Sequence, residues 1–260
     1  MINQLRAEWQ KVRSLKMFWI LLIVAAAVTV GMALMSLVMY HIYGDNGSIG
    51  TSSETMHVIT TSNWWTIATG GVPTFLQIVL AVFAIMVVTS EYTGNTMQLT
   101  LLARPRRAQV WAAKLLLVGV ASLVLTFLLI VLSFVLTFAL QHGMTTASFA
   151  SLFGHEFVSG CLLPTLATTL FALFSLGLGF LLRSSTGAIF LMIGFCLILP
   201  IILSMAGHSD VVLDIAKWSP QVLYNELFNG NEIVRTTLGL AAWTVVSLGA
   251  GLWVFQKKDA

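Results

Sequence analysis

Long apolar runs separated by short polar segments dominate the chain. A membrane-spanning helix needs about 20 apolar residues, and six runs are long enough, at residues 17–40, 73–90, 115–140, 157–182, 186–206 and 236–255. Pro164 and Pro200 lie inside the fourth and fifth runs, and we expect them to kink or locally unwind those helices. The pattern therefore predicts an all-α polytopic membrane protein, with a six-span transmembrane domain over residues 17–260.

Residues 1–16 have a different pattern. Leu5, Trp9 and Val12 recur at helical spacing, and basic residues lie between them. This pattern predicts a short amphipathic helix in the membrane interface, ahead of the first span. A basic anchor without helical structure would explain the charges, but it would explain the apolar positions less well.

Composition supports the membrane assignment. The chain is 58% hydrophobic and 9% charged, with a mean hydropathy of +0.92, whereas soluble domains are about 25% charged. A soluble enzyme, a disordered protein and a nucleic-acid binder are therefore excluded as leading interpretations. The net charge of +3 comes from 13 Lys and Arg residues that are too scattered to form a basic groove.

The basic residues predict an orientation. Eleven of the 13 fall on one side of the six spans, and only Lys217 and Arg235 fall on the other, in the predicted outer loop 207–235 and at its border. Because Lys and Arg concentrate in cytoplasmic loops, we expect both termini to be cytoplasmic. An even number of spans requires the same placement of the two ends.

Several expected signatures of chemistry are missing from the sequence. There is no G-x-x-x-x-G-K-[ST] phosphate loop, no H-E-x-x-H and no G-x-S-x-G. No charged residue lies in the middle of a run, where ion-coupled transporters place their titratable groups; most polar residues there are Ser and Thr, which can bond to their own backbone. Cys161 and Cys196 lie in apolar runs and are expected to pack rather than bind metal. We expect no catalytic residues, no metal and no cofactor in this chain.

The polar segment at residues 91–110 is the most informative part of the sequence. Glu91 closes the second run, Gly94 permits a sharp turn, and Pro105 ends a short helix before the basic residues. Met97, Leu101 and Leu102 would form the apolar face of that helix. The pattern predicts a rigid surface that docks a cytoplasmic partner. Glu91 either braces this loop by pairing with Arg106, Arg107 or Lys114, or is a hydrated carboxylate whose pairing contributes little.

Two motifs resemble those of the permeases of the ABC-2 exporter family. The first is E-Y-x-G-x-T at residues 91–96, followed by L-L-A-R-P-R-R at 101–107 and by Lys114 before the next span. The second is the Pro-containing segment at residues 218–224, ahead of the sixth span. The interfacial helix, the six spans and the cytoplasmic termini resemble the same family.

The resemblance implies the membrane subunit of an ATP-driven exporter in a bacterial plasma membrane. Two permeases, identical or homologous, would assemble with two copies of a separate ATPase that binds ATP and Mg. The cargo would be an amphiphilic or hydrophobic compound, such as an antibiotic, a peptide or a lipid. The resemblance places ATPase coupling at Glu91, Tyr92, Gly94, Thr96, Met97, Leu101, Leu102, Pro105, Arg106 and Arg107, and a substrate path on the second and fifth spans, for which we select Phe75, Phe83, Phe190 and Phe195.

Two other classes of function remain open at this point. One is a membrane immunity or scaffold protein that sequesters a toxin without transporting it. The other is an enzyme embedded in the membrane. A neighbouring ATPase-encoding reading frame, or an ATPase that co-purifies with the chain, would separate the transporter from both.

Overall fold

The structure is a computed structural model that describes residues 7, 9–13, 16–44, 72–93, 107–140, 157–205, 214 and 216–258. These residues are almost all helical, and no strand occurs among them. They contain six segments long and apolar enough to cross a membrane, which confirms the predicted all-α, six-span fold. The spans are formed by α2 (Lys16–Gly44), α4 (Val72–Thr93), α6 (Arg107–Leu140), η2 (Val158–Leu162) with α8 (Leu163–Leu182), α9 (Ser185–Ile193) with η3 (Gly194–Ile198) and α10 (Leu199–Met205), and α13 (Ile233–Lys258).

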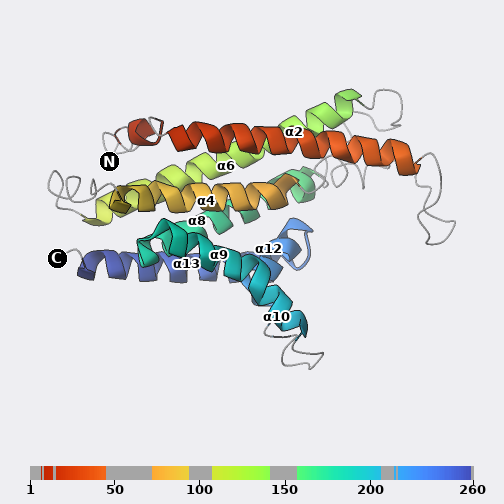
Figure 1. The fold of residues 1–260 in the computed structure, drawn as a ribbon. Helices are drawn as coiled ribbons and strands as arrows, with labels where there is room; N and C mark the ends of the chain where they lie inside the picture. Colours follow the sequence, from red (N-terminus) through yellow and green to blue (C-terminus); the bar gives the residue numbers. More distant parts are fainter. Residues whose placement is uncertain are drawn as a thin grey trace.

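The long helices run side by side as a bundle, with α8 near its middle (Figure 1). Helix α8 packs against α4, α6 and α13, and 72% of the apolar stretch of the fourth span is buried, against 11% for the fifth span. Both termini lie at the same end of the bundle, which we call the terminal end. The short helix α12 (Pro220–Phe228) lies at the opposite end, against α8 and α13.

Small residues allow α8 to pack closely against its neighbours. A Cβ atom added at Gly177 would lie 2.5 Å from the Oγ atom of Ser247, and one at Gly251 would lie 2.9 Å from Cβ of Phe180. The backbones of α8 and α13 therefore approach through a small-residue seam of the kind that joins membrane helices. This seam lies within one chain.

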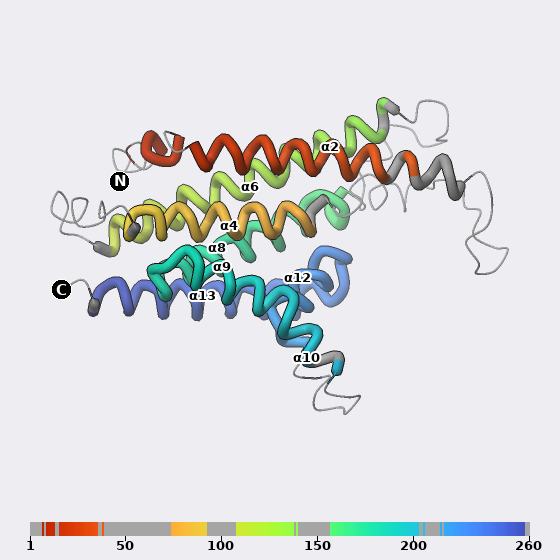
Figure 2. The backbone as a smooth tube through the Cα atoms, viewed as in Figure 1, coloured from red at the N-terminus to blue at the C-terminus, as the bar shows by residue number. Residues whose placement is uncertain are grey.

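The two prolines inside the spans each follow a π-helical turn. Pro164 and Pro200 lie two residues beyond η2 and η3, respectively. Because proline has no N–H to donate to the carbonyl four residues earlier, a wider turn accommodates the missing bond. Beyond η3 the chain changes direction, and α10 diverges from α13 (Figure 2).

The predicted coupling loop is shorter than the sequence pattern indicates. Helix α4 continues through Thr93 and α6 begins at Arg107, so the segment between them is residues 94–106 rather than 91–110. Helix α6 begins at Arg107, earlier than the start predicted for the third span at residue 115, and Lys114 is buried inside the bundle. Of the predicted site residues, Leu5, Gly94, Thr96, Met97, Leu101, Leu102, Pro105 and Arg106 lie outside the described residues.

Candidate coupling site at the terminal end of the bundle

A carboxylate between two lysines joins three elements at the terminal end. Oε1 of Glu91, in the last turn of α4, lies 2.8 Å from Nζ of Lys114 on α6 and 3.2 Å from Nζ of Lys11 in the N-terminal helix. The Glu91 and Lys114 side chains are 10% and 1% exposed, whereas that of Lys11 is 42% exposed. Lys114 also donates to the carbonyl of Val87 at 3.4 Å. This confirms one of the partners predicted for Glu91 and adds Lys11, which the sequence did not indicate.

Helical periodicity explains why these charges are buried. On α4, Glu91 follows Ala84, Val87 and Val88 at the spacing of one helical face, and all four are buried. On α6, Lys114 lies one turn after the buried Val110. Each charge therefore occupies the core-facing stripe of its own helix. An isolated buried charge is strongly unfavourable because it loses its hydration. The attraction between Glu91 and Lys114 offsets this desolvation cost for both residues.

A second cationic contact ties the same end of the bundle to α8 and α13. The guanidinium carbon of Arg183 lies 5.4 Å from the centre of the Tyr92 ring, a cation–π distance. One Arg183 nitrogen also donates to the carbonyl of Val254 at 2.8 Å. Arg183 caps α8 with a positive φ of 55°, and its N–H donates to the carbonyl of Gly179. We call Lys11, Glu91, Tyr92, Lys114 and Arg183 the terminal cluster.

Where the structure describes it, the N-terminal helix packs against the bundle. Residues 9–13 are helical; Val12 is buried in the same core as Phe83, and Trp9 is 46% exposed. The Trp9 ring lies 6.0 Å from the Phe18 ring at the start of α2. The helix therefore has one side against the bundle and one side outward.

The terminal cluster links five elements of the bundle. It joins the N-terminal helix, α4, α6, α8 and α13; Glu91 and Tyr92 lie in the last turn of α4, and Lys114 lies two turns into α6. Within the described part of the chain, no group of three or more His, Cys, Asp or Glu residues is placed to hold a metal ion. The arrangement ties the end of α4 and the start of α6 to one another through one buried carboxylate.

The four phenylalanines selected for a substrate path are not brought together. Phe83 is buried, 5.8 Å from the Phe18 ring in the core. Phe195 packs 5.6 Å from both Phe174 and Trp243. Phe75 and Phe190 are instead 46% and 69% exposed. Phe83 thus belongs to the core and Phe195 is partly buried against its neighbours, and only Phe75 and Phe190 are exposed at the surface.

A sequence model described as "ABC-2 family transporter protein" matches residues 4–199. The match covers about three quarters of the chain, including the N-terminal helix, the terminal cluster and almost all of the first five spans. The chain belongs to the ABC-2 family of transporter proteins. It is a membrane permease, a transport subunit that is not itself catalytic, and its family implies association with an ABC ATPase. No curated protein matches the chain.

The part of the permease beyond the matched region is held by contacts that the sequence did not reveal. Gln77, buried in α4, donates through Nε2 to Oε1 of Gln221 on α12 at 2.8 Å. Tyr224 of α12 lies with its hydroxyl oxygen 3.2 Å from Oγ1 of Thr168. Burial raises the pKa of the Tyr224 phenol well above its usual range, so this group stays neutral at physiological pH.

An ion-pair group joins α12 to the start of α13 at the same end of the permease. Arg235 contacts Glu226, and its Nε lies 2.8 Å from Oε2 of Glu232. For the contact between α4 and α12, the sequence signal was Gln77, a side-chain amide inside an apolar run. Its partner Gln221 is 144 residues away in the chain, and local sequence pattern does not indicate which distant residues meet.

Proposed function

We propose that this permease exports an amphiphilic or hydrophobic compound, such as an antibiotic, a peptide or a lipid, across a bacterial plasma membrane. A separate ABC ATPase, present in two copies, binds ATP and Mg and supplies the energy. The observation that carries the proposal is the family match over residues 4–199. The absence of a phosphate loop and of charges in the middle of the apolar runs supports an external energy source.

The orientation we propose places the terminal end in the cytoplasm. Eleven Lys and Arg residues support it, against two on the other side. Segment 94–106 then faces the cytoplasm, where the ATPase would be. In this orientation the terminal cluster lies between the docking segment and the spans.

Coupling would run through Glu91. The ATPase would press on segment 94–106, with Leu101 and Leu102 forming the apolar contact, and the push would reach α4 and α6 at their clamped ends. Because Glu91 is bonded to both Lys114 and Lys11, α4, α6 and the N-terminal helix would move together rather than separately. Rigid coupling of this kind transmits a displacement that a flexible loop would absorb.

The second permease of the transporter would pack against the fifth span. Phe190 and Ile201 are 69% and 56% exposed on it, and its apolar stretch is the least buried of the six. The exposed Phe75 of α4 would contribute to the same surface. A substrate path between two permeases would then be lined by the second and fifth spans.

The experiment uses the permease purified with the ATPase that co-purifies from native membranes, reconstituted in liposomes. The amide oxygen of the Glu91→Gln variant can still accept from Nζ of Lys114. Glu91→Gln should therefore keep assembly and ATP binding but lower ATPase stimulation by a panel of amphiphilic antibiotics and fluorescent phospholipids several-fold. Leu102→Asp should abolish co-purification, because it places a charge on an apolar contact. Glu226→Gln is the matched control, since it removes a paired carboxylate at the opposite end of the bundle.

Three results would overturn the proposal. Normal assembly and normal stimulation in both Glu91→Gln and Leu102→Asp would show that segment 94–106 only connects two spans and does not couple the ATPase to them. Proton-driven export by the permease alone would contradict an ATPase as the energy source. Protection of cells from a toxin without ATP hydrolysis would identify the sequestering protein instead.

A further inference from the structure

An open apolar groove lies between the N-terminal helix, α2 and α6. Its volume is about 650 Å³, within the size range of small-molecule binding sites. Aromatic side chains of the N-terminal segment and aliphatic side chains of α6 line it, among them Trp9, Trp19, Leu116, Val120 and Val124. Val120 is 61% exposed and Val124 is 45% exposed, so the groove opens on the side of the bundle that faces away from its core.

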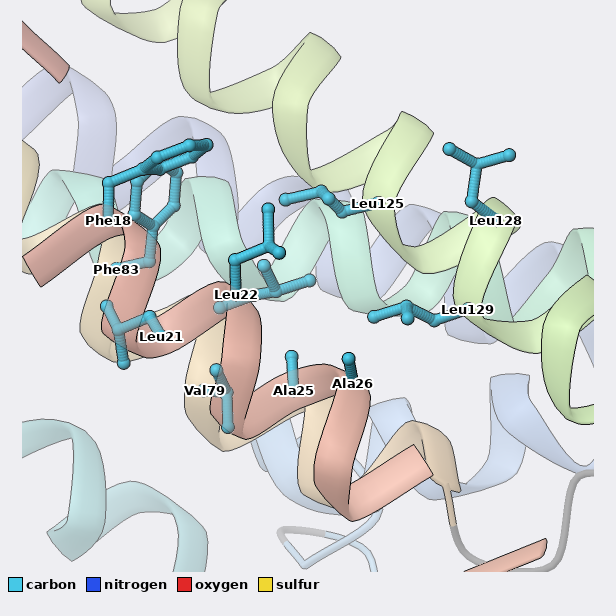
Figure 3. Close-up of a pocket in the computed structure, with 11 residues that line it drawn as sticks. Phe18, Leu21, Leu22, Ala25, Ala26, Val79, Phe83, Leu125, Leu128 and Leu129 are labelled. Atoms are coloured by element: carbon cyan, nitrogen blue, oxygen red, sulfur yellow. The ribbon is translucent and has the colours of Figure 1, made fainter. Parts of the chain in front are cut away.

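The space continues beneath the groove as a second apolar cavity of about 140 Å³ between α2, α4 and α6. Phe18, Leu22 and Leu125 line both spaces. In Figure 3 the side chains of Leu22 and Leu125 project toward one another across the gap between α2 and α6. The two helices thus do not interdigitate fully here, although helices normally pack without large voids. Because a cavity with this lining does not hold water, an apolar occupant fits it best.

The position of the groove indicates the membrane interface. Three aromatic rings close its terminal end, with Phe18 lying 6.0 Å from Trp9 and 5.6 Å from Trp19. Nε1 of Trp19 donates to the carbonyl of Arg13 at 3.0 Å. Indole rings favour the headgroup level of a bilayer, so the mouth of the groove lies at that level. From there the groove follows α6 from Leu116 to Leu125, into the hydrocarbon layer.

Charge complementarity selects the kind of lipid. Arg13 and Lys16 are both exposed, in the segment that also contributes the aromatic end of the groove. Lys11, in the same segment, is bonded to Glu91. An anionic phosphate at this level would meet two cationic side chains, as lipid headgroups do at basic juxtamembrane segments.

We propose that this groove holds the acyl chain of an anionic phospholipid of the cytoplasmic leaflet, with the headgroup phosphate at Arg13 and Lys16. The lipid is resident rather than transported, and it braces the N-terminal helix against α2 and α6 beside Lys11 and Glu91. The site rests on the cytoplasmic orientation proposed above. It does not depend on the identity of the cargo.

The test is photo-crosslinking of the permease, assembled with its ATPase, in phosphatidylcholine nanodiscs. The bilayer contains a small fraction of either phosphatidylglycerol or phosphatidylcholine with a diazirine in one acyl chain, and labelled peptides are mapped by mass spectrometry. We expect phosphatidylglycerol to label residues 116–125 several-fold more than residues 132–137 of the same helix. Phosphatidylcholine should label residues 116–125 several-fold less.

Matched variants separate the site from general lipid contact. Val120→Trp, and independently Val124→Phe, fill the groove and should reduce labelling of residues 116–125 several-fold. Val135→Trp is the control, because Val135 is 49% exposed on α6 outside the groove. Arg13→Gln with Lys16→Gln should remove the preference for phosphatidylglycerol, whereas Lys257→Gln should preserve it.

Three results would overturn the proposal. Uniform labelling along α6 would indicate surrounding lipid only, and equal labelling by the two lipids in the unmodified permease would remove the headgroup site. Loss of the label on adding ATP would identify the bound chain as cargo. Since labelling is read without transport, a permease that labels as expected but exports nothing would overturn the proposed function alone.

Discussion

Glu91 and Lys114 show how a charge survives inside a membrane protein. Each lies on the buried face of its helix, and their ionic atoms are 2.8 Å apart. A buried pair of this kind adds little net stability compared with apolar residues, but removing one partner leaves an uncompensated charge. The pair is therefore better understood as a clamp that fixes α4 against α6 than as a source of folding energy.

We predict that Lys114→Met lowers the free energy of unfolding by about 3 kcal/mol, because it removes the buried partner of the Glu91 carboxylate and leaves only the partly exposed Lys11. Lys11→Met should cost less than about 1 kcal/mol, since Lys11 is 42% exposed and solvent screens its interaction. Chemical unfolding in detergent micelles measures both. The double variant Glu91→Leu with Lys114→Met should recover most of the unfolding free energy that Lys114→Met loses. If the double variant is as unstable as Lys114→Met, the stability loss does not come from the unpaired Glu91 charge.

Hydroxyl groups follow a simpler rule at the same scale. Thr29, Thr89 and Thr165 each donate to the carbonyl four residues earlier in their own helix, as the sequence led us to expect. Thr244 and Ser247 of α13 also donate to α8 carbonyls, at Leu170 and Phe174. Those two bonds reinforce the seam between α8 and α13.

At the scale of elements, that seam sets the distance between α8 and α13. Gly177→Ala should destabilise the permease by about 1–3 kcal/mol, because the new Cβ would lie 2.6 Å from the Ser247 backbone as well as against its side chain. Gly249→Ala is the control, since no atom lies within 4 Å of its new Cβ. It should be neutral or stabilising by up to about 1 kcal/mol. Equal effects in thermal unfolding would show that the seam is not tight.

Helix α12 is fastened to the spans by the Gln77–Gln221 bond. Gln221→Leu should cost about 1–3 kcal/mol, because it leaves the buried amide of Gln77 without this partner. Gln77→Leu should cost less, since Gln221 keeps Asn225 within 3.3 Å. In a double-mutant cycle measured by unfolding, the double variant should lose less unfolding free energy than the sum of the losses in the two single variants. Strict additivity would mean that the bond does not couple α12 to α4.

At the scale of the whole molecule, orientation is the property on which coupling and the lipid site both depend. A cysteine introduced at residue 50 should react with a membrane-impermeant maleimide in intact cells, and one at residue 258 should react only after lysis. The native Cys161 and Cys196 are buried free thiols and give little background. Reversed labelling would refute the orientation, and with it the placement of segment 94–106 in the cytoplasm.

Sequence alone determined the class, the six spans, the N-terminal helix and the family, because each is written in local periodicity or contiguous motifs. It predicted the third span from residue 115, whereas helix α6 begins eight residues earlier, at Arg107. The reason is physical: a lysine ended the apolar run in the sequence pattern, whereas in the structure Lys114 continues the helix and pairs with the Glu91 carboxylate inside the bundle. Pattern also selected Phe83 for a path, although packing places it in the core.

Only the tertiary structure decided which distant residues meet. Lys11 and Glu91 are 80 residues apart in the chain, and Gln77 and Gln221 are 144 apart. The apolar groove between α2 and α6 is likewise invisible in sequence, where its residues look like ordinary lipid-facing positions. Periodicity fixes which face of a helix is apolar, because that depends on near neighbours. The rotation and depth at which two helices pack decide the partners, and those depend on every side chain in the contact.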